Sequence, residues 1–258
     1  MSTNLRVGID GAVATITLDR ADKLNALSMA MVEALEQACA AIDRDTAVRA
    51  VIVASASEKA FCAGADILDW SPQGSLGMWR RWIRDGHRAF DRLARLRQPT
   101  IAAIGGIAYG GGLELALACD LRIAGAGARF AFPEVTIGAV PAWLGSQRLP
   151  RVIGAGRAKQ MILAGEPIDA ATAASWGLVN EVVAADRLAP RALELARRIA
   201  ENAPSAVQAA KQLVDAAGGE GLATALESLA AGLAASTDDA REGIAAFRAK
   251  RKPDYTGE

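Results

Sequence analysis

The sequence predicts an α/β fold built on parallel strands. Two apolar stretches that read as strands, residues 47–54 and 100–104, each lead into a small-residue loop and then into a helical pattern. Repetition of this order favours parallel pairing with right-handed crossovers. Ligands in such folds bind at the carboxyl ends of the strands, where both loops are expected. The length of 258 residues allows one α/β domain, or one domain with an appendage.

The first elements are a hairpin and a helix. Residues 4–9 and 12–18 read as strands, joined by an Asp-Gly dipeptide at residues 10–11 that is typical of tight hairpin turns. Ser28 is a good helix N-cap and predicts a helix that runs to about residue 43, where apolar residues recur at helical spacing. The strand at 47–54 follows this helix.

The middle of the chain alternates between helices and strands. Residues 69–77 contain a proline and glycines and predict a mobile loop. Beyond the loop we expect, in order, a helix over about 78–96, the strand at 100–104, a glycine turn that starts a short helix, and short strands at 121–124 and 129–132.

The last third of the chain predicts helices only. Four alanine-rich amphipathic segments are expected over about 190–202, 204–216, 219–235 and 237–250. They are too rich in alanine to form a large core of their own, so we expect them to pack on another surface. We therefore divide the chain into a core with the active site (residues 1–190) and a helical oligomerisation region (residues 191–258).

Composition excludes several classes of function. Twenty-nine Lys and Arg residues balance 29 Asp and Glu residues, so no global positive field attracts nucleic acid. Three cysteines without metal-ligand spacing and a single histidine, His87, argue against a metal site and against a Cys–His or Ser–His–Asp centre. We find no signal-peptide pattern and no apolar run of membrane-spanning length, so we expect a cytoplasmic protein without a membrane partner.

The strongest functional signal lies in two loops and two glutamates. Residues 110–114 read Gly-Gly-Gly-Leu-Glu, and residues 61–67 form a second small-residue loop after a strand. Glycines permit close approach of the backbone to a ligand, and each loop could supply one N–H group to a developing oxyanion. Glu114 ends the first motif, and Glu134 follows Pro133 twenty residues later. Such a site suits the polarisation of a carbonyl and the movement of protons beside it.

Each of these features also has a purely structural interpretation. Three glycines are more often a tight turn than an oxyanion hole, and the motif matches neither the Walker A loop nor the dinucleotide fingerprint. Glu114 could be an acidic residue that the helix dipole favours in a first turn, and Glu134 could cap a turn after Pro133. Only the combination of the features points to function.

The combination resembles the crotonase (enoyl-CoA hydratase/isomerase) superfamily over nearly the whole chain. The matching stretches are residues 16–20, 23–28, 61–67, 101–120, 130–134, Gly138, 147–154, 174–179, 242–243 and 247–253. The resemblance implies a crotonase-like (ββα) superhelix whose C-terminal helices form a trimer interface. Trimers of this superfamily commonly pair into hexamers, so the resemblance implies a homo-oligomer that is a trimer or a hexamer.

The resemblance also assigns roles to residues. The N–H groups of Ala65 and Gly111 would hold the thioester oxygen, Glu114 would act as base toward water, and Glu134 would deliver a proton. Coenzyme A would enter as part of the acyl-CoA thioester substrate, with no separate cofactor. The positions that would contact its nucleotide, pantetheine and thioester are Lys23, Leu24, Ala26, Ala63, Asp66, Ile67, Gly110, Pro133, Ala142, Phe247 and Lys250.

The expected reaction is hydration of a trans-2-enoyl-CoA to a 3-hydroxyacyl-CoA, because both glutamates are present. A Δ3,Δ2-enoyl-CoA isomerase is the alternative within the family, and an RNA-binding protein of the same fold is the alternative from another class. The main departure from the family pattern is Trp143, in a turn that is usually small and rich in glycine. Two interpretations stay open: its indole narrows the acyl pocket, or it packs in the core.

Overall fold

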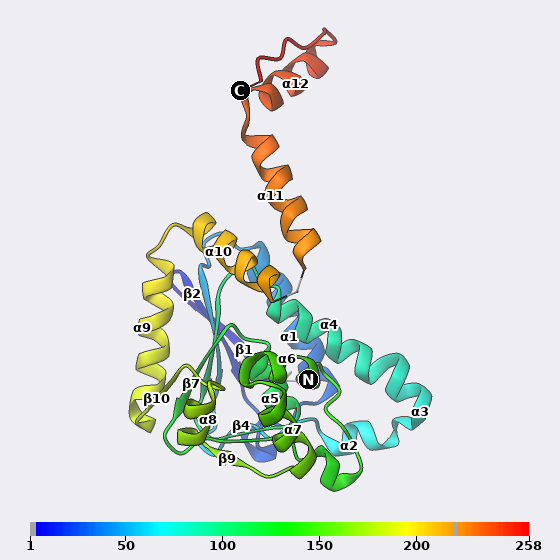
Figure 1. Ribbon diagram of the computed structural model, residues 1–258, viewed down its shortest axis with the longest axis vertical. Helices are drawn as coiled ribbons and strands as arrows, with labels where there is room; N and C mark the ends of the chain where they lie inside the picture. Colours follow the sequence, from blue (N-terminus) through cyan, green and yellow to red (C-terminus); the bar gives the residue numbers. More distant parts are fainter. Residues whose placement is uncertain (1–3, 219–220, 258) are drawn as a thin grey trace. The chain divides into compact units, whose positions relative to one another are not determined.

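The computed structural model describes residues 4–218 and 221–257 and confirms a mixed α/β fold with parallel sheets (Figure 1). The chain forms two compact units, Met1–Pro204 and Ser205–Glu258. The first unit contains every strand found among the described residues, and the second is helical. The boundary of the oligomerisation region at residue 190 stays a prediction.

The larger sheet has six strands in the order β1-β2-β3-β5-β7-β10. The expected hairpin is confirmed, because β1 and β2 pair antiparallel with Asp10 opposite Val13. All other pairs in this sheet are parallel. The strands are β1 (Leu5–Asp10), β2 (Val13–Leu18), β3 (Ala50–Ser55), β5 (Thr100–Ile104), β7 (Leu121–Gly125) and β10 (Glu181–Val183).

A second sheet of four short strands gives the fold its repeat. Its order is β4 (Ala60–Cys62), β6 (Ile107–Tyr109), β8 (Arg129–Ala131) and β9 (Ile168–Asp169), with β9 antiparallel to β8. Strands β4, β6 and β8 each follow a strand of the larger sheet and lead into helical structure. Strands β4 and β6 pair in parallel, so the two small-residue loops at their carboxyl ends are neighbours.

The helices of the first unit lie in the order that the sequence predicts, with additional ones after residue 144. Ser28 caps the first helix as expected, since its hydroxyl accepts a hydrogen bond from the Met31 amide. Apart from the short helices of residues 67–77, the α-helices of this unit are α1 (Met29–Arg44), α4 (Ile83–Ala94), α5 (Gly111–Leu117), α6 (Gly145–Ile153), α7 (Ala155–Ala164), α8 (Ala170–Trp176) and α9 (Leu188–Ala200).

The prediction of a loop over residues 69–77 is wrong. The chain there forms the short helices α2 (Ile67–Trp70), η2 (Ser71–Gln73) and α3 (Gly74–Gly77), and a π-helical turn, η3 (Met78–Trp82), joins them to α4. Asp66 caps α2 by accepting a hydrogen bond from the Leu68 amide. Pro72 lies in the first turn of η2, where its missing N–H group costs nothing.

The larger sheet has an apolar core on each face. Val51 and Val53 of β3 point into the main core with α1 and α4, whereas Ala50 and Ile52 point to the opposite face, which α9 covers (Figure 1). This alternation is the two-residue period of a strand, and burial on both faces explains why the parallel strands read as continuous apolar runs.

The second unit consists of the predicted helices, α10 (Pro204–Ala217), α11 (Leu222–Ser236) and α12 (Asp238–Ala249). Large apolar side chains on these helices are exposed within the single chain: Leu213, Val214, Leu222, Leu226, Leu229, Leu233, Ile244 and Phe247. Oligomerisation through them stays a prediction. In the described part of the chain, no helix combines the length and the apolar character needed to span a bilayer.

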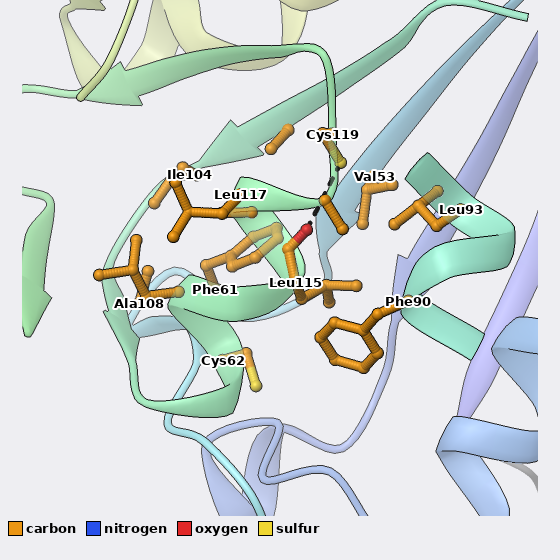
Figure 2. Packing of buried hydrophobic residues seen from close by; sticks show 14 of the residues in the cluster. Val53, Phe61, Cys62, Phe90, Leu93, Ile104, Ala108, Leu115, Leu117 and Cys119 are labelled. Atoms are coloured by element: carbon orange, nitrogen blue, oxygen red, sulfur yellow. Dashed lines mark hydrogen bonds between the residues drawn. The ribbon is translucent and has the colours of Figure 1, made fainter. Parts of the chain in front are cut away.

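Close backbone contact joins helix α5 to strand β4. A Cβ atom at Gly112 would lie 2.2 Å from the carbonyl oxygen of Cys62. Figure 2 shows the surrounding packing, in which Leu115 of α5 lies among Phe61, Cys62 and Phe90. The absence of a side chain at residue 112 therefore sets the distance between the two small-residue loops.

This contact predicts that Gly112→Ala destabilises the protein. Because the obstructing atom belongs to the backbone, relief needs a shift of α5 or β4, and we expect a loss of about 3 kcal/mol or more in the free energy of unfolding. Gly127→Ala is the matched control, since nothing lies within 4 Å of its Cβ position. Urea denaturation of both variants provides the measurement; equal stabilities would contradict the prediction.

Candidate active site

Three segments meet at the carboxyl ends of β4 and β6. The backbone around Leu27 is tied to the first loop by two hydrogen bonds, from the Leu27 amide to the Gly64 carbonyl (2.7 Å) and from the Asp66 amide to the Leu27 carbonyl (2.9 Å). On the other side, a Cβ atom at Gly111 would lie 3.3 Å from the Ala65 nitrogen. Within the described residues, the bonds that hold these loops together use neither the Ala65 nor the Gly111 amide.

A polar network that sequence reasoning missed supports these loops. Arg20 donates from Nη1 to Asp66 Oδ2 (2.6 Å) and to the Ala26 carbonyl (2.9 Å). Asn25 is fully buried, and its Nδ2 donates to Ser55 Oγ (2.7 Å). Burial is the largest single influence on the pKa of Asp66 and raises it. The hydrogen bonds from Arg20 and the Leu68 amide, with the Arg20 and Lys23 charges, together outweigh burial, so the pKa is lowered. Asp66 therefore fixes the shape of the loop as an ionised carboxylate.

Glu114 is held in a buried cradle of backbone amides. It lies in the first turn of α5 and is 2% exposed. Its Oε1 atom accepts hydrogen bonds from the Trp143 amide (2.7 Å) and the Gly145 amide (2.8 Å). A Cβ atom at Gly145 would lie 2.7 Å from Glu114 Cγ, so this approach also depends on the absence of a side chain. The two amides fix one carboxyl oxygen and orient the other.

Glu134 approaches from the opposite loop. It begins the 3₁₀ helix η4 (Glu134–Ile137) directly after Pro133. Its Oε2 atom is buried, and among the described residues no hydrogen-bond partner satisfies it. Its Oε1 atom lies 2.8 Å from the position that a Cβ of Gly110 would occupy. A buried carboxyl oxygen without a protein partner is available to a ligand or to water.

Both carboxyl groups hold their protons more tightly than ordinary glutamates. Burial raises the pKa of Glu114 to about 7, although the Gly145 and Trp143 amides and the Arg148 charge act in the opposite direction. The nearby Glu134 charge adds to the increase. Burial likewise raises the pKa of Glu134 to about 7. The Glu134 charge links the titration of Glu114 to that of its neighbour.

The two glutamates line one pocket of about 250 Å³. Six other site residues that the sequence analysis predicted also line this pocket: Ala63, Ala65, Ile67, Gly110, Pro133 and Ala142. Larger apolar side chains also form its wall; the sequence analysis singled out only one of them, Trp143. They are Trp70, Met78, Trp82, Ile137, Val140 and Trp143.

The other site residues predicted from the sequence do not line the pocket. Gly111 lies beside the Trp143 ring, since a Cβ atom at residue 111 would be 3.0 Å from the ring. Lys23 and Leu24 are exposed, and Leu24 is connected to the first loop through a hydrogen bond from the Ala63 amide to its carbonyl (3.0 Å). Phe247 in α12 and Lys250 at the C-cap of that helix belong to the second unit.

Trp143 combines the two interpretations that the sequence left open. Its side chain is 1% exposed and stacks on Trp82, with ring centroids 5.5 Å apart, and its Nε1 donates to the Trp82 carbonyl (3.3 Å). The Phe90 ring also packs against the indole, with ring centroids 5.1 Å apart. The indole is thus a core residue that also forms part of the pocket wall. Its amide, rather than that of Ala142, reaches Glu114.

Two other candidate chemistries lack the groups that they need. Burial raises the pKa of the Cys62 thiol to about 12, so the reactive thiolate does not form near neutral pH. His87 Nε2 donates to the Ala142 carbonyl (2.8 Å), which makes His87 a structural partner of the segment before Trp143. Over residues 4–218 and 221–257, no cluster of three metal-ligating side chains is found.

The raised pKa of Glu114 predicts a pH-dependent effect of Glu114→Gln on stability. A carboxyl whose pKa is raised in the folded state stabilises the fold fully below its ordinary pKa of 4.5, and this contribution is lost as the pH rises through about 7. The variant avoids that loss, so its stability relative to wild type should increase by up to about 3 kcal/mol between pH 5 and pH 8. Urea denaturation at both pH values measures the difference. Exposed Glu33→Gln is the control, and a pH-independent difference for Glu114→Gln would contradict the prediction.

Comparison with known proteins places this site in a family. The enoyl-CoA hydratase/isomerase family pattern matches residues 8–258. The short-chain-enoyl-CoA hydratase of Clostridium acetobutylicum is 41% identical over 245 residues, which cover 94% of each chain. The crotonyl-CoA hydratase of Syntrophomonas wolfei is 36% identical, again over 94% of each chain.

Solved structures agree with the sequence comparison. A crystal structure of an enoyl-CoA hydratase from Bacillus anthracis superposes with a TM-score of 0.83 at 40% sequence identity, over 99% of this chain and 100% of that one. The family pattern, the relatives and the shared fold all extend over nearly the full length. The chain therefore belongs to the enoyl-CoA hydratase/isomerase family.

Proposed function

We propose that this protein adds water across the double bond of a trans-2-enoyl-CoA to give a 3-hydroxyacyl-CoA. The observation that carries the proposal is the pair of carboxyl groups, Glu114 and Glu134, which line one pocket and both have a pKa near 7. At neutral pH such a pair carries one proton between its members, so one carboxyl can accept a proton while the other gives one. The names of the relatives support the same reaction.

In this proposal the amides of Ala65 and Gly111 bind the thioester oxygen. Negative charge builds on that oxygen when water attacks Cβ, and donors fixed in advance stabilise it at no cost in reorganisation. The close approach of Gly111 to the Ala65 nitrogen supports a shared target for the two N–H groups. Their freedom from the hydrogen bonds that hold the loops supports it as well.

The two glutamates then divide the proton transfers. Ionised Glu114 takes a proton from the water whose oxygen bonds to Cβ, and the electron pair of the double bond moves to Cα and the thioester. Protonated Glu134 gives its proton to Cα, which regenerates the carbonyl. No electrons are exchanged with an outside group, so coenzyme A is needed only as part of the substrate. The single proton of the pair returns to Glu134 through solvent before the next turnover.

We further propose that the preferred acyl group is short. The indoles of Trp82 and Trp143 stack at the pocket wall and are almost completely buried, which leaves about 250 Å³ beside the glutamates. Relatives named for short-chain-enoyl-CoA and crotonyl-CoA support this assignment.

We also propose which residues contact the coenzyme A part of the substrate. They are the loop residues Lys23, Leu24, Ala26 and Asp66 and the C-terminal residues Phe247 and Lys250. A homotrimer or a hexamer built on exposed leucines of α11 is the proposed assembly.

A direct test uses the purified protein with crotonyl-CoA and with a 3-enoyl-CoA. Hydration removes the enoyl-thioester absorbance of the first substrate and adds the mass of one water molecule to it. An isomerase would instead convert the 3-enoyl substrate into the conjugated one without a change in mass. Absence of a product that has gained water would overturn the proposed function.

The paired roles predict strong but non-additive effects of Glu114→Gln and Glu134→Gln. Each change removes one proton acceptor or donor, and we expect turnover to fall by about two to four orders of magnitude. The double variant should lose far less than the product of the two, because both groups act in one transition state. Steady-state hydration of crotonyl-CoA measures this, with Glu33→Gln as control. Wild-type turnover in either single variant would disprove the assignment.

The pocket wall predicts a change in specificity for Trp143→Ala. Removal of the indole leaves a cavity next to the acyl group, so the ratio of kcat/KM for a long enoyl-CoA to that for crotonyl-CoA should rise. Stability should fall by about 3–5 kcal/mol, because the same indole is a core residue. Measurements over a series from butenoyl to decenoyl thioesters, with melting curves, separate the two effects. Trp176→Ala, in α8 and outside the pocket lining, should leave the ratio unchanged. An unchanged ratio for Trp143→Ala would show that the limit on chain length lies elsewhere.

A further inference from the structure

The segment that holds Glu114 is itself held by one face of helix α4. Three contacts connect residues 142–148 to α4 and the residue before it: the Ala142 carbonyl to His87, the Trp143 indole to the Trp82 carbonyl, and Arg148 to Asp91. His87 and Asp91 are four residues apart in α4, so both lie on the same side of the helix. None of these contacts touches the pocket carboxyls directly.

Arg148 is the unusual member of this group. It lies in the first turn of α6, three residues after Gly145, and its amide donates to the Leu144 carbonyl (2.9 Å). Its side chain is only 8% exposed and forms an ion pair with Asp91 at 2.8 Å, through Nη2. Its Nη1 is buried without a partner in the part of the chain that the structure describes. Burial of a guanidinium group with one unsatisfied nitrogen costs free energy, so a purely structural role is poorly served by arginine here.

We propose that Arg148, anchored by Asp91, is a positioning residue for Glu114. Its ion pair fixes the start of α6 against α4, so that the amides of Trp143 and Gly145 both reach Glu114 Oε1. Its charge also favours the ionised form of Glu114, which is the form that accepts the proton of water. This inference rests on the proposed hydration and on the role of Glu114 in it.

The charges around the two groups define what a pH profile reports. The pKa of Glu114 depends on the charges of Glu134 in η4 and Arg148 in α6. The pKa of Arg148 depends in turn on Asp91 in α4 and Cys119 after α5. Loss of the Arg148 charge removes a cation that lowers the pKa of Glu114. The acidic limb of kcat/KM should therefore move to higher pH, because more of Glu114 is protonated at a given pH.

The deciding experiment is a double-mutant cycle of Arg148→Gln with Glu114→Gln, measured by hydration of crotonyl-CoA. In the wild-type background, Arg148→Gln should lower kcat roughly 10-fold through misplacement of the base. In the Glu114→Gln background, where the group that it positions is already inactive, the same change should lower kcat by less than about twofold. The acidic limb of Arg148→Gln should shift to higher pH.

Two further variants separate this role from general damage to the fold. Arg122→Gln removes another buried arginine, whose contacts are the Leu178 and Cys119 carbonyls, and it should lower stability without moving the acidic limb. If Arg148→Gln does not fold, Asp91→Asn replaces it in the cycle, since it weakens the anchor and keeps the arginine. We expect the same dependence on Glu114, with a smaller effect.

The outcomes distinguish this inference from the proposed function. The role of Arg148 would be overturned if Arg148→Gln lowered kcat by the same factor in both backgrounds, or if it left the acidic limb of kcat/KM in place. The proposed function would still stand in that case, provided that wild type hydrates crotonyl-CoA and Glu114→Gln does not. Failure of wild type to hydrate crotonyl-CoA, or full activity of Glu114→Gln, would overturn both.

Discussion

The two hydrogen bonds from the Trp143 and Gly145 amides to Glu114 Oε1 are the interaction on which the candidate site depends. They offset part of the increase that burial causes in the pKa of this carboxyl group. The opposed effects of burial and the amides leave the pKa of Glu114 at about 7, so the group can act as acid or base at neutral pH. The (ββα) repeat positions it, because the parallel pairing of β4 with β6 brings the two loops together.

The packing of the core and the chemistry of the site use the same side chains. Trp143 stacks on Trp82 in the core, lines the pocket and donates its amide to Glu114. Gly112 and Gly145 are needed because a Cβ atom at either would meet backbone or the carboxyl side chain itself. Changes in this region therefore alter stability and activity together, and the double-mutant comparison is needed to separate them.

Much of the fold and the centre of the site could be predicted from the sequence because their signals are local. The Asp-Gly hairpin, the Ser28 cap and the glycine motif before Glu114 each lie within a few residues of what they predict. Strands β4 and β6 have three residues each, too few for a periodic pattern. The proline and glycines of residues 67–77 are typical of a loop, so the short helices there could not be predicted. The ion pair of Arg148 with Asp91 joins residues 57 apart, so only the fold reveals it.

The most direct test of the central claim is an infrared titration of the carboxyl groups in wild type against Glu114→Gln and Glu134→Gln. The account predicts that protonated carboxyl bands assigned to this pair persist at pH 6 and disappear through about pH 7, in two coupled steps. Removal of either glutamate should simplify the titration to one step. If both groups are already ionised at about pH 5, as ordinary glutamates are, the shared-proton mechanism is contradicted.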